Sequence, residues 1–381
     1  MSLVVDEHRE YLADRHRLSA YERAIAEVVR PGDVVLDLGA GTGIFGLLAC
    51  RVGAARVYAV EVTSFIALTR AIARANACSD RIVHIKEHSA HVTLPERVDV
   101  VVCDQIGRFG FEAGVIENLA DARRRFLKPG GRLVPSAVEL WVTAAECPEA
   151  FAQIEFWNTR PAGVDVTPAR TIAANTGYSR HLKAGELLAA PVCTGRVDLT
   201  HDVPRPLRLT ARLHVERAGT LHGLGGWFVA ELSPLVTMTN SPLAPDRINR
   251  RNVFLPFDRP VEVAAGDLVD VSLQVLPEDS VLVWQADVSS PNAPDQPRAR
   301  FAHSTWRGML LDRDDLERTR PAHRPQLTPR GRARLSVLEL ADGRRTVAEI
   351  EEEVRRRHAD LFQTDGEAAT FVAEVLTRYS T

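Results

Sequence analysis

A strand-like run that leads directly into a glycine-rich segment restricts the fold of this chain more than any other feature. Val34–Leu38 is almost wholly apolar, Gly39–Gly43 reads Gly-Ala-Gly-Thr-Gly, and helical spacing continues to about Val52. Further strand signals recur at 57–60, 82–85 and 98–103. Strands that alternate with helices in this way predict a parallel sheet with helices on both faces. We therefore expect an α/β Rossmann-like domain over residues 1–135.

The segment before this strand is expected to be helical over residues 6–30. Ser19 and Glu22 have the spacing of a capping box, and apolar residues recur after them at helical intervals. Pro31-Gly32 then ends the helix.

The pattern changes near Pro135 and becomes alternating further along the chain. Apolar and polar residues take turns over 207–215, and the same period of two returns over 269–275. Such alternation predicts a half-buried antiparallel sheet in a sandwich or barrel. Residues 136–310 are therefore expected to form a β-barrel domain.

The last part of the chain, residues 320–381, is expected to be a small helical module. Thr328 and Pro329 open one helix, and Thr346 with Glu349 forms a capping box that opens a second. A last helix should bury one face, formed by Phe371, Val375 and Tyr379. A module of about 60 residues would be marginally stable in isolation.

Charge and composition exclude several classes of protein. The net charge of −3 argues against a strongly basic nucleic-acid binder, and no stretch approaches the ~18 apolar residues of a membrane span. No signal-peptide pattern is evident, and five scattered cysteines without a C-x-x-C pair predict reduced thiols in a cytoplasmic protein. His84, His88 and His91 lie on an expected strand and loop, not on one helix face, so no metal site is expected.

The glycine segment predicts a cofactor that contains a nucleoside. Small residues let the backbone approach a ligand, and the helix N-terminus offers free N–H groups. Glu61 lies 22 residues after Gly39 at the end of the next expected strand, where a carboxylate can accept both ribose hydroxyls. A Walker A loop is excluded because no Gly-Lys-Ser/Thr follows. A dinucleotide and S-adenosyl-L-methionine both remain possible ligands. Asp37 favours S-adenosyl-L-methionine, because a carboxylate suits a cationic ligand.

The segment V-L-D-L-G-A-G-T-G resembles the first motif of class I methyltransferases. Residues 8–17 are similar to the preceding helix of protein arginine methyltransferases, and 127–131 with Pro135 resembles the boundary between their sheet domain and barrel. Residues 156–190 lie where that family inserts its dimerisation arm. The resemblance covers about residues 8–290 and implies S-adenosyl-L-methionine as cofactor and a homodimer. The candidate cofactor-binding residues are Arg17, at the place of the family's carboxylate-binding arginine, Asp37, Gly39, Gly41, Gly43, Glu61 and Ser89.

Two departures from that family concern the acceptor substrate. The family holds a guanidinium between two glutamates nine residues apart, whereas this chain has Asp104 first and Ala113 ninth, with Glu112 one position early. The family's T-H-W loop is replaced by Arg-Ile-Asn at 247–249. A rigid fork for arginine is therefore not expected, but one carboxylate or base can still orient an amine and remove its proton. The catalytic candidates are Asp104, Glu112 and His8, each of which could instead be a solvated or packing side chain.

Residues 340–350 resemble the helical part of PqqD-like domains, which recognise ribosomally made precursor peptides, and the resemblance covers roughly 328–379. The three leading strands of such domains are not evident unless 298–311 supplies one. A helical cap on the barrel is the alternative. Residues 318–334 contain six arginines and no acid, which could attract an acidic leader peptide or RNA. Only three of the chain's 47 basic residues are lysines, so arginine is frequent everywhere and a plain linker explains this segment equally well.

These observations favour an S-adenosylmethionine-dependent N-methyltransferase that acts on an amine of a ribosomally synthesised precursor peptide in natural-product biosynthesis. Methyltransferases of daptide-type clusters are the nearest functional analogue. Protein arginine N-methylation is the alternative enzyme hypothesis, and a non-catalytic peptide-binding scaffold is the alternative outside catalysis.

Overall fold

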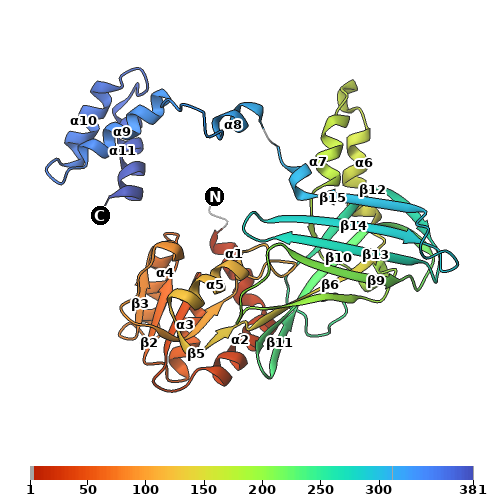
Figure 1. The fold of residues 1–381 in the computed structure, drawn as a ribbon. Coiled ribbons are helices and arrows are strands. Elements are labelled where there is room, and N and C mark those ends of the chain that lie inside the picture. Colours follow the sequence, from red (N-terminus) through yellow and green to blue (C-terminus); the bar gives the residue numbers. More distant parts are fainter. Residues whose placement is uncertain (1–3, 311, 381) are drawn as a thin grey trace. The chain divides into compact units, whose positions relative to one another are not determined.

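Five parallel strands form the first sheet of the computed structural model, which describes residues 4–310 and 312–380 (Figure 1). The strands are β1 (Val34–Leu38), β2 (Arg56–Val60), β3 (Ile82–Ile85), β4 (Val98–Cys103) and β5 (Leu127–Val134), in the order β3-β2-β1-β4-β5. The helices of this part are α1 (Val4–Ala13), α2 (Arg15–Val28), α3 (Ile44–Arg51), α4 (Ile66–Ala75) and α5 (Val115–Arg125). The expected Rossmann-like α/β architecture is confirmed. All five residues of β1 are buried, as the central strand of such a sheet requires.

The segment expected to be helical over 6–30 is helical as far as Val28, but it is divided at Asp14 into α1 and α2. Asp14 is the N-cap of α2, and its carboxylate accepts a hydrogen bond from the backbone N–H of Arg17 at 3.1 Å. Ser19 and Glu22 therefore lie inside α2 and form no capping box there. Asp is among the strongest N-cap residues, so the first cap sets the start of the helix.

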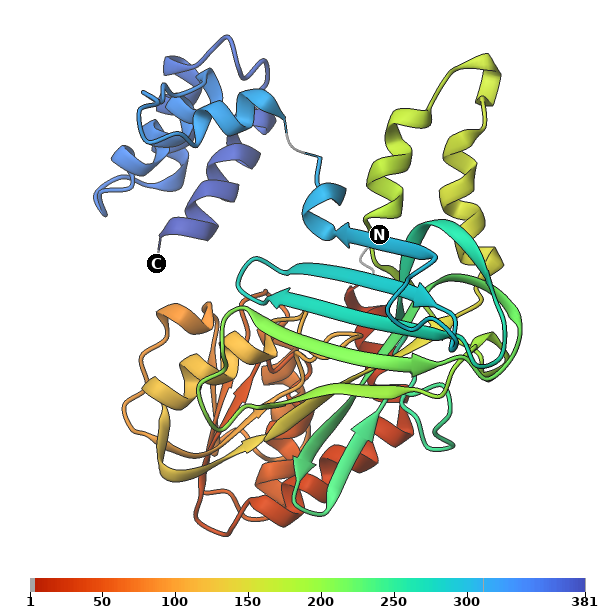
Figure 2. The same ribbon diagram turned by 45° about the vertical axis from the view of Figure 1, so that its right-hand side comes forward.

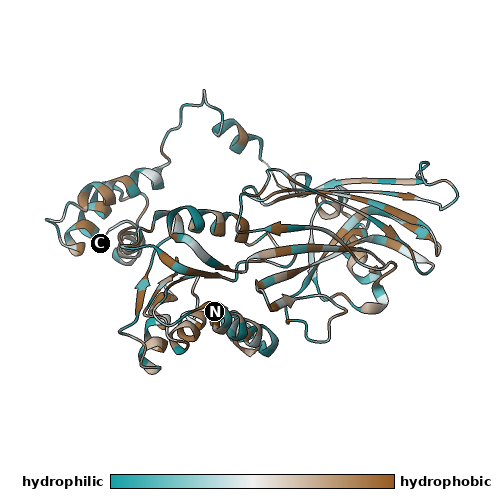
Figure 3. Cartoon of the chain, turned by 60° about the horizontal axis from the view of Figure 1, so that its bottom comes forward, coloured by the Kyte–Doolittle hydropathy of each residue, from teal (hydrophilic) through white to brown (hydrophobic). Residues whose placement is uncertain are grey.

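Two antiparallel sheets follow the parallel one, as the alternating pattern predicted. One sheet has the order β7-β12-β10-β6-β8 with β11 paired to β10, and the other has the order β15-β14-β13-β9. Their strands are β6 (Ala137–Ala145), β7 (Tyr178–Arg180), β8 (Val192–Asp198), β9 (Leu207–His214), β10 (Gly219–Ser233), β11 (Val236–Thr239), β12 (Asn252–Val263), β13 (Leu268–Leu276), β14 (Val281–Ser289) and β15 (Ala299–Ser304). Apolar and polar residues alternate along many of these strands (Figure 3), so one face of each is buried.

A helical arm rises from the antiparallel sheets between β6 and β7 (Figure 2). It consists of α6 (Pro148–Glu155), α7 (Arg170–Ala174) and short turns between them. The arm expected over 156–190 therefore begins earlier, at Pro148, which takes the first helical turn of α6. Its tip exposes Phe156 and Val164.

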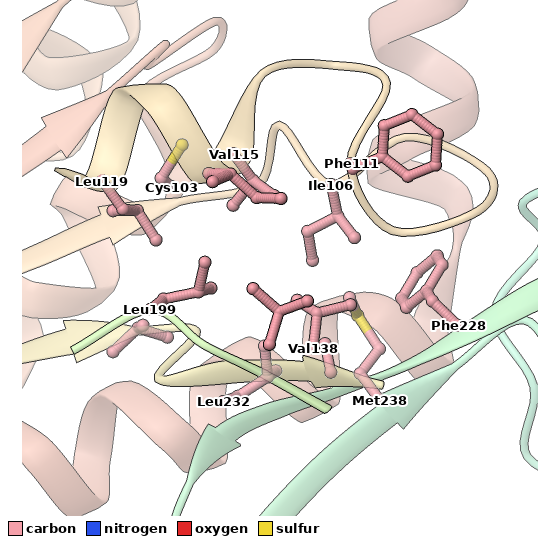
Figure 4. Close-up of a cluster of buried hydrophobic side chains, with 14 of the residues drawn as sticks. Cys103, Ile106, Phe111, Val115, Leu119, Val138, Leu199, Phe228, Leu232 and Met238 are labelled. Atoms are coloured by element: carbon pink, nitrogen blue, oxygen red, sulfur yellow. The ribbon is translucent and has the colours of Figure 1, made fainter. Parts of the chain in front are cut away.

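The parallel sheet and the antiparallel sheets share one hydrophobic core. Ile106, Val115 and Leu119 from the loop and helix after β4 face Val138 of β6 and Leu232 of β10 (Figure 4). All five side chains are almost fully buried. Because this packing joins the two parts, residues up to Met309 form one compact unit.

Residues from Leu310 form a second compact unit with its own core. Its helices are α8 (Arg313–Arg318), α9 (Pro329–Leu340), α10 (Val347–Arg357) and α11 (Asp365–Tyr379). Thr328 caps α9, and Thr346 with Glu349 forms the expected capping box of α10. Phe371 and Val375 are buried as expected, but Tyr379 is 54% exposed because it lies in the last turn of α11.

The C-terminal unit receives no strand from the segment before it. Residues 299–304 form β15, which pairs with β14 in the antiparallel sheet of the first unit. The notion that 298–311 supplies a leading strand to the helical module is therefore wrong. Among the described residues, no helix is both long and apolar enough to cross a membrane.

Candidate active site

A cavity of about 900 Å³ opens at the carboxyl ends of β1 and β4. Its walls come from the glycine segment after β1, from α1, from the loop after β4, and from Ser179, His181 and residues 249–251 of the antiparallel part. β1 and β4 are neighbours at the point where the strand order of a doubly wound sheet changes direction. Open α/β sheets bind their ligands at such a point.

The glycine segment has a backbone that only glycine adopts easily. Gly41 has a φ of +51°, and a Cβ atom there would lie 2.6 Å from Cε1 of His8. Its N–H donates to Oε2 of Glu61 at 3.1 Å, and its carbonyl accepts a hydrogen bond from the hydroxyl of Thr69. Gly39 and Gly41 both line the cavity, so the sequence prediction of a close backbone approach fits this geometry.

Helix α1 covers the glycine segment with two aromatic rings. The His8 ring stacks on Phe65 with a centroid separation of 4.0 Å, and Tyr11 lies over the guanidinium of Arg17 at 5.3 Å. Partial burial lowers the pKa of His8, which favours its neutral form. His8 therefore lies in the cavity wall as a neutral imidazole near pH 7.

Asp104 follows β4 directly and is held by three side chains. Its Oδ2 accepts from Nε of Arg17 at 2.6 Å and from Nη2 of Arg250 at 3.0 Å, and its Oδ1 accepts from the Tyr21 hydroxyl at 2.8 Å. Burial alone would raise the pKa of Asp104, but the two guanidinium groups lower it overall. Asp104 is therefore an ionised carboxylate at neutral pH.

Two of these partners were not predicted from the sequence. Tyr21 had no signal beyond its position in the segment expected to be helical, and Arg250 lies 146 residues from Asp104. The sequence offered no signal for Arg250, because arginine is frequent throughout the chain and 247–249 was noted only for the histidine it lacks. The fold brings Arg250 to the site on the segment that leads into β12.

Glu112 lines the cavity, but its carboxylate is turned into its own loop. It accepts hydrogen bonds from the backbone N–H groups of Arg108 at 2.5 Å, Phe109 at 3.0 Å and Phe111 at 3.3 Å. To reach an acceptor substrate, Glu112 would have to give up these bonds. The structure thus places Asp104 and His8 in the cavity wall, with Asp104 already bonded to Arg17, Arg250 and Tyr21. Glu112 stabilises the loop after β4.

Four predicted cofactor residues do not line the cavity: Asp37, Gly43, Glu61 and Ser89. Asp37 is buried behind the glycine segment and accepts from the N–H of Gly46 at 2.9 Å. Gly43 is the left-handed N-cap of α3, with a φ of +74°. Ser89 begins a short 3-10 turn, Ser89–His91, and its carbonyl accepts from Arg125. Asp37 and Gly43 hold the shape of the site from outside it.

Burial raises the pKa of Asp37 to about 7 from 3.8, which gives a pH-dependent stability. The folded state keeps a proton that the unfolded state has already lost between about pH 4 and 7, so the free energy of unfolding falls as the pH rises through that window. Asp37→Asn removes this pH-dependent fall in the free energy of unfolding, and its amide oxygen can still accept the hydrogen bond from the N–H of Gly46. Urea denaturation should show a stability gain of the variant over the wild type that is larger at pH 8 than at pH 5. A gain that is the same at both pH values would contradict this assignment.

The residues present fit S-adenosyl-L-methionine. Glu61 lies at the end of β2 beside the glycine segment, where it can exchange its bond to Gly41 for ribose hydroxyls. Arg17 lies in the cavity wall among Tyr11, Tyr21 and Phe45, and supplies a positive charge for a carboxylate. A single Cβ atom at Gly41 would fill part of this space.

Comparisons with known proteins find methyltransferases. The family model described as Ribosomal protein L11 methyltransferase (PrmA) matches residues 18–141. Protein arginine N-methyltransferase 6 of Xenopus laevis is 26% identical over 286 residues, which span 71% of this chain and 84% of that protein. Protein arginine N-methyltransferase PRMT10 of Oryza sativa subsp. japonica is 38% identical over 136 residues, 35% of this chain and 36% of that protein.

Solved structures show the same fold over most of the chain. The Trypanosoma brucei PRMT1 enzyme-prozyme heterotetrameric complex with AdoHcy matches with a TM-score of 0.69 and 19% identity, over 78% of this chain and 97% of that chain. Protein Arginine Methyltransferase 10 of Arabidopsis thaliana matches with a TM-score of 0.67 and 21% identity over the same shares. The chain is an S-adenosylmethionine-dependent methyltransferase of class I with the fold of the protein arginine methyltransferases.

Proposed function

We propose that this methyltransferase acts on nitrogen atoms of protein arginine side chains. The observation that carries the proposal is one cavity that joins the glycine segment to an ionised carboxylate, Asp104. The relatives that match over most of the chain are protein arginine N-methyltransferases. This ranking reverses the one drawn from the sequence alone, because the relatives support the arginine alternative over a precursor peptide.

The bound cofactor would supply a methyl group on a positively charged sulfur. Arg17 and Glu61 would hold its two ends, and Asp104 would orient the acceptor nitrogen so that its lone pair points along the S–CH₃ axis, an alignment that can contribute ~7–11 kcal/mol. An incoming guanidinium would take the place of Arg250 at Oδ2 of Asp104. His8, neutral near pH 7, can receive the released proton.

The proposal is tested by incubating the protein with S-adenosylmethionine and two matched peptides, one with a central arginine and one with a central lysine. Mass spectrometry with fragmentation locates the added methyl group. Methylarginine on the first peptide supports the proposal. Methylation of the lysine or of the N-terminal amine, with arginine untouched, would overturn it.

Transfer to a peptide amine is the second candidate, and the bonding of Glu112 favours it. Glu112 is tied to the backbone of its loop, and Ala113 stands at the ninth position after Asp104. One carboxylate then remains to bind the acceptor. A single carboxylate suits an amine better than a guanidinium, which would be held between two. In this version the C-terminal helical unit recruits a precursor peptide in the manner of a PqqD-like module.

Removal of residues 320–381 tests that recruiting role. The helices α9, α10 and α11 bury a core of their own, so the first unit should remain folded without them. We expect unchanged binding of S-adenosylhomocysteine, a raised KM for a full-length peptide substrate and a nearly unchanged kcat, because remote contacts bind ground and transition states alike. A soluble truncation with an unchanged KM would refute recruitment, and an insoluble one would favour a capping role.

We also propose that the chain is a homodimer held by its helical arm, and that it acts in the cytoplasm. Phe156 is 49% exposed at the end of α6 and lines, with Trp157 and Tyr178, an apolar hollow of about 580 Å³. Sedimentation velocity should show a dimer that Phe156→Glu dissociates. A wild-type monomer at micromolar concentration would refute the arm proposal.

A further inference from the structure

One wall of the cavity carries a concentration of positive charge. Arg108 from the loop after β4, and Arg250 and Arg251 before β12, carry this charge, and His181 next to β7 lines the same wall. These residues come from three segments that the antiparallel sheets and the α/β part bring together. Arg250 is almost buried, whereas Arg108 and Arg251 are exposed.

The exposed arginines of this wall are not used inside the protein. Over residues 4–310 and 312–380, neither Arg108 nor Arg251 forms an ion pair through its side chain. Arg251 and Arg247 also both lower the pKa of His181, after burial as the largest cause, so these side chains lie close together. The charges of Arg108 and Arg251 are therefore available to a ligand.

Three acids near this wall already make contacts inside the protein, and one of them, Asp104, is paired with arginines. Asp104 is shared by Arg17 and Arg250, and Glu112 is held by the backbone of its loop. Asp14, the N-cap of α2, also accepts from the N–H of Asn249 at 2.6 Å. The remaining acids of the cavity, Glu7 and Glu10, lie on α1.

We infer that the acceptor is an acidic peptide, with carboxylates next to the methylated nitrogen that pair with Arg108 and Arg251. This inference rests on the proposed transfer to a protein or peptide nitrogen and adds the class of sequence around it. The nitrogen would reach Asp104 beside the glycine segment, while Asp or Glu side chains of the same peptide would lie along the basic wall. Complementary charge of this kind chiefly sets which partner is selected and how fast it binds.

The test compares three labelled peptides of equal length with one central arginine, flanked by glutamates, by glycines or by lysines. Binding to the full chain saturated with S-adenosylhomocysteine is measured by fluorescence anisotropy. We expect the glutamate peptide to bind at least about tenfold more tightly than the glycine peptide and to weaken as salt is added. The lysine peptide should bind most weakly.

Variants then assign the effect to the wall. Arg108→Ala and Arg251→Ala should each weaken the glutamate peptide by roughly two- to fivefold, and the double variant by about tenfold, with little change for the glycine peptide. Arg208→Ala, an exposed arginine of β9 outside the cavity, is the matched control and should change nothing.

Equal binding of all three peptides, or tightest binding of the lysine peptide, would overturn the inference. So would a preference for glutamate that survives the double variant. Preferred binding of the glutamate peptide without methylation of its arginine would support the acidic specificity and refute arginine transfer, so the two failures are distinguishable. Unchanged binding of S-adenosylhomocysteine in every variant shows that the site is intact.

Discussion

Gly41→Val is expected to abolish measurable binding of S-adenosylhomocysteine, and Glu61→Ala to weaken it by roughly tenfold to a hundredfold. A side chain at Gly41 would enter the cavity at a left-handed backbone position, 2.6 Å from His8. Glu61→Ala would remove the charged hydrogen bonds that Glu61 makes to the ribose, which contribute ~1.5–3 kcal/mol. Isothermal titration calorimetry measures both affinities.

Two control variants separate this effect from a general loss of stability. Gly130 has a φ of +72° with open space around it, so Gly130→Val has the same backbone strain without any collision in the cavity. Glu96 pairs with Arg56 outside the cavity, and Glu96→Ala should leave the affinity unchanged. Unchanged affinity in both Gly41→Val and Glu61→Ala, with the fold intact, would remove the cofactor from this site.

Asp104→Asn is expected to reduce turnover by about 10²-fold or more, the scale on which a misplaced reacting group slows a reaction, while binding of the cofactor product is kept. Asparagine has nearly the same shape but no charge, so it cannot neutralise Arg17 and Arg250 or attract a cationic acceptor. A single-turnover assay with radiolabelled S-adenosylmethionine measures the chemical step.

The same substitution should also lower stability. Removing one partner of a buried ion pair costs about 3–5 kcal/mol, and Asp104 is only 11% exposed. Circular dichroism must therefore show that the variant is folded at the assay temperature. Asp99→Asn is the matched control, since Asp99 lies on β4 as well and pairs with Lys128 at 2.8 Å outside the cavity. Near-normal turnover of Asp104→Asn would exclude Asp104 from the mechanism.

The sequence by itself determined the elements whose signal is local. The apolar run at Val34–Leu38, the glycines after it and the capping box at Thr346 depend on neighbouring residues, and each formed the expected strand, turn or helix start. The alternation over 207–215 likewise fixed which face of β9 is buried. The capping box expected at Ser19 and Glu22 was wrong, because α2 begins earlier, at its N-cap Asp14.

The tertiary structure decided how the acceptor side of the cavity is charged. The spacing of Asp104 and Glu112 could not reveal that one carboxylate is shared by two arginines and that the other is tied to its own loop. Arg250 reaches Asp104 only because β12 and β4 belong to sheets that pack on one core. Periodicity and spacing report neighbours along the chain, whereas the charge of a cavity depends on side chains that only the packing of distant segments brings together.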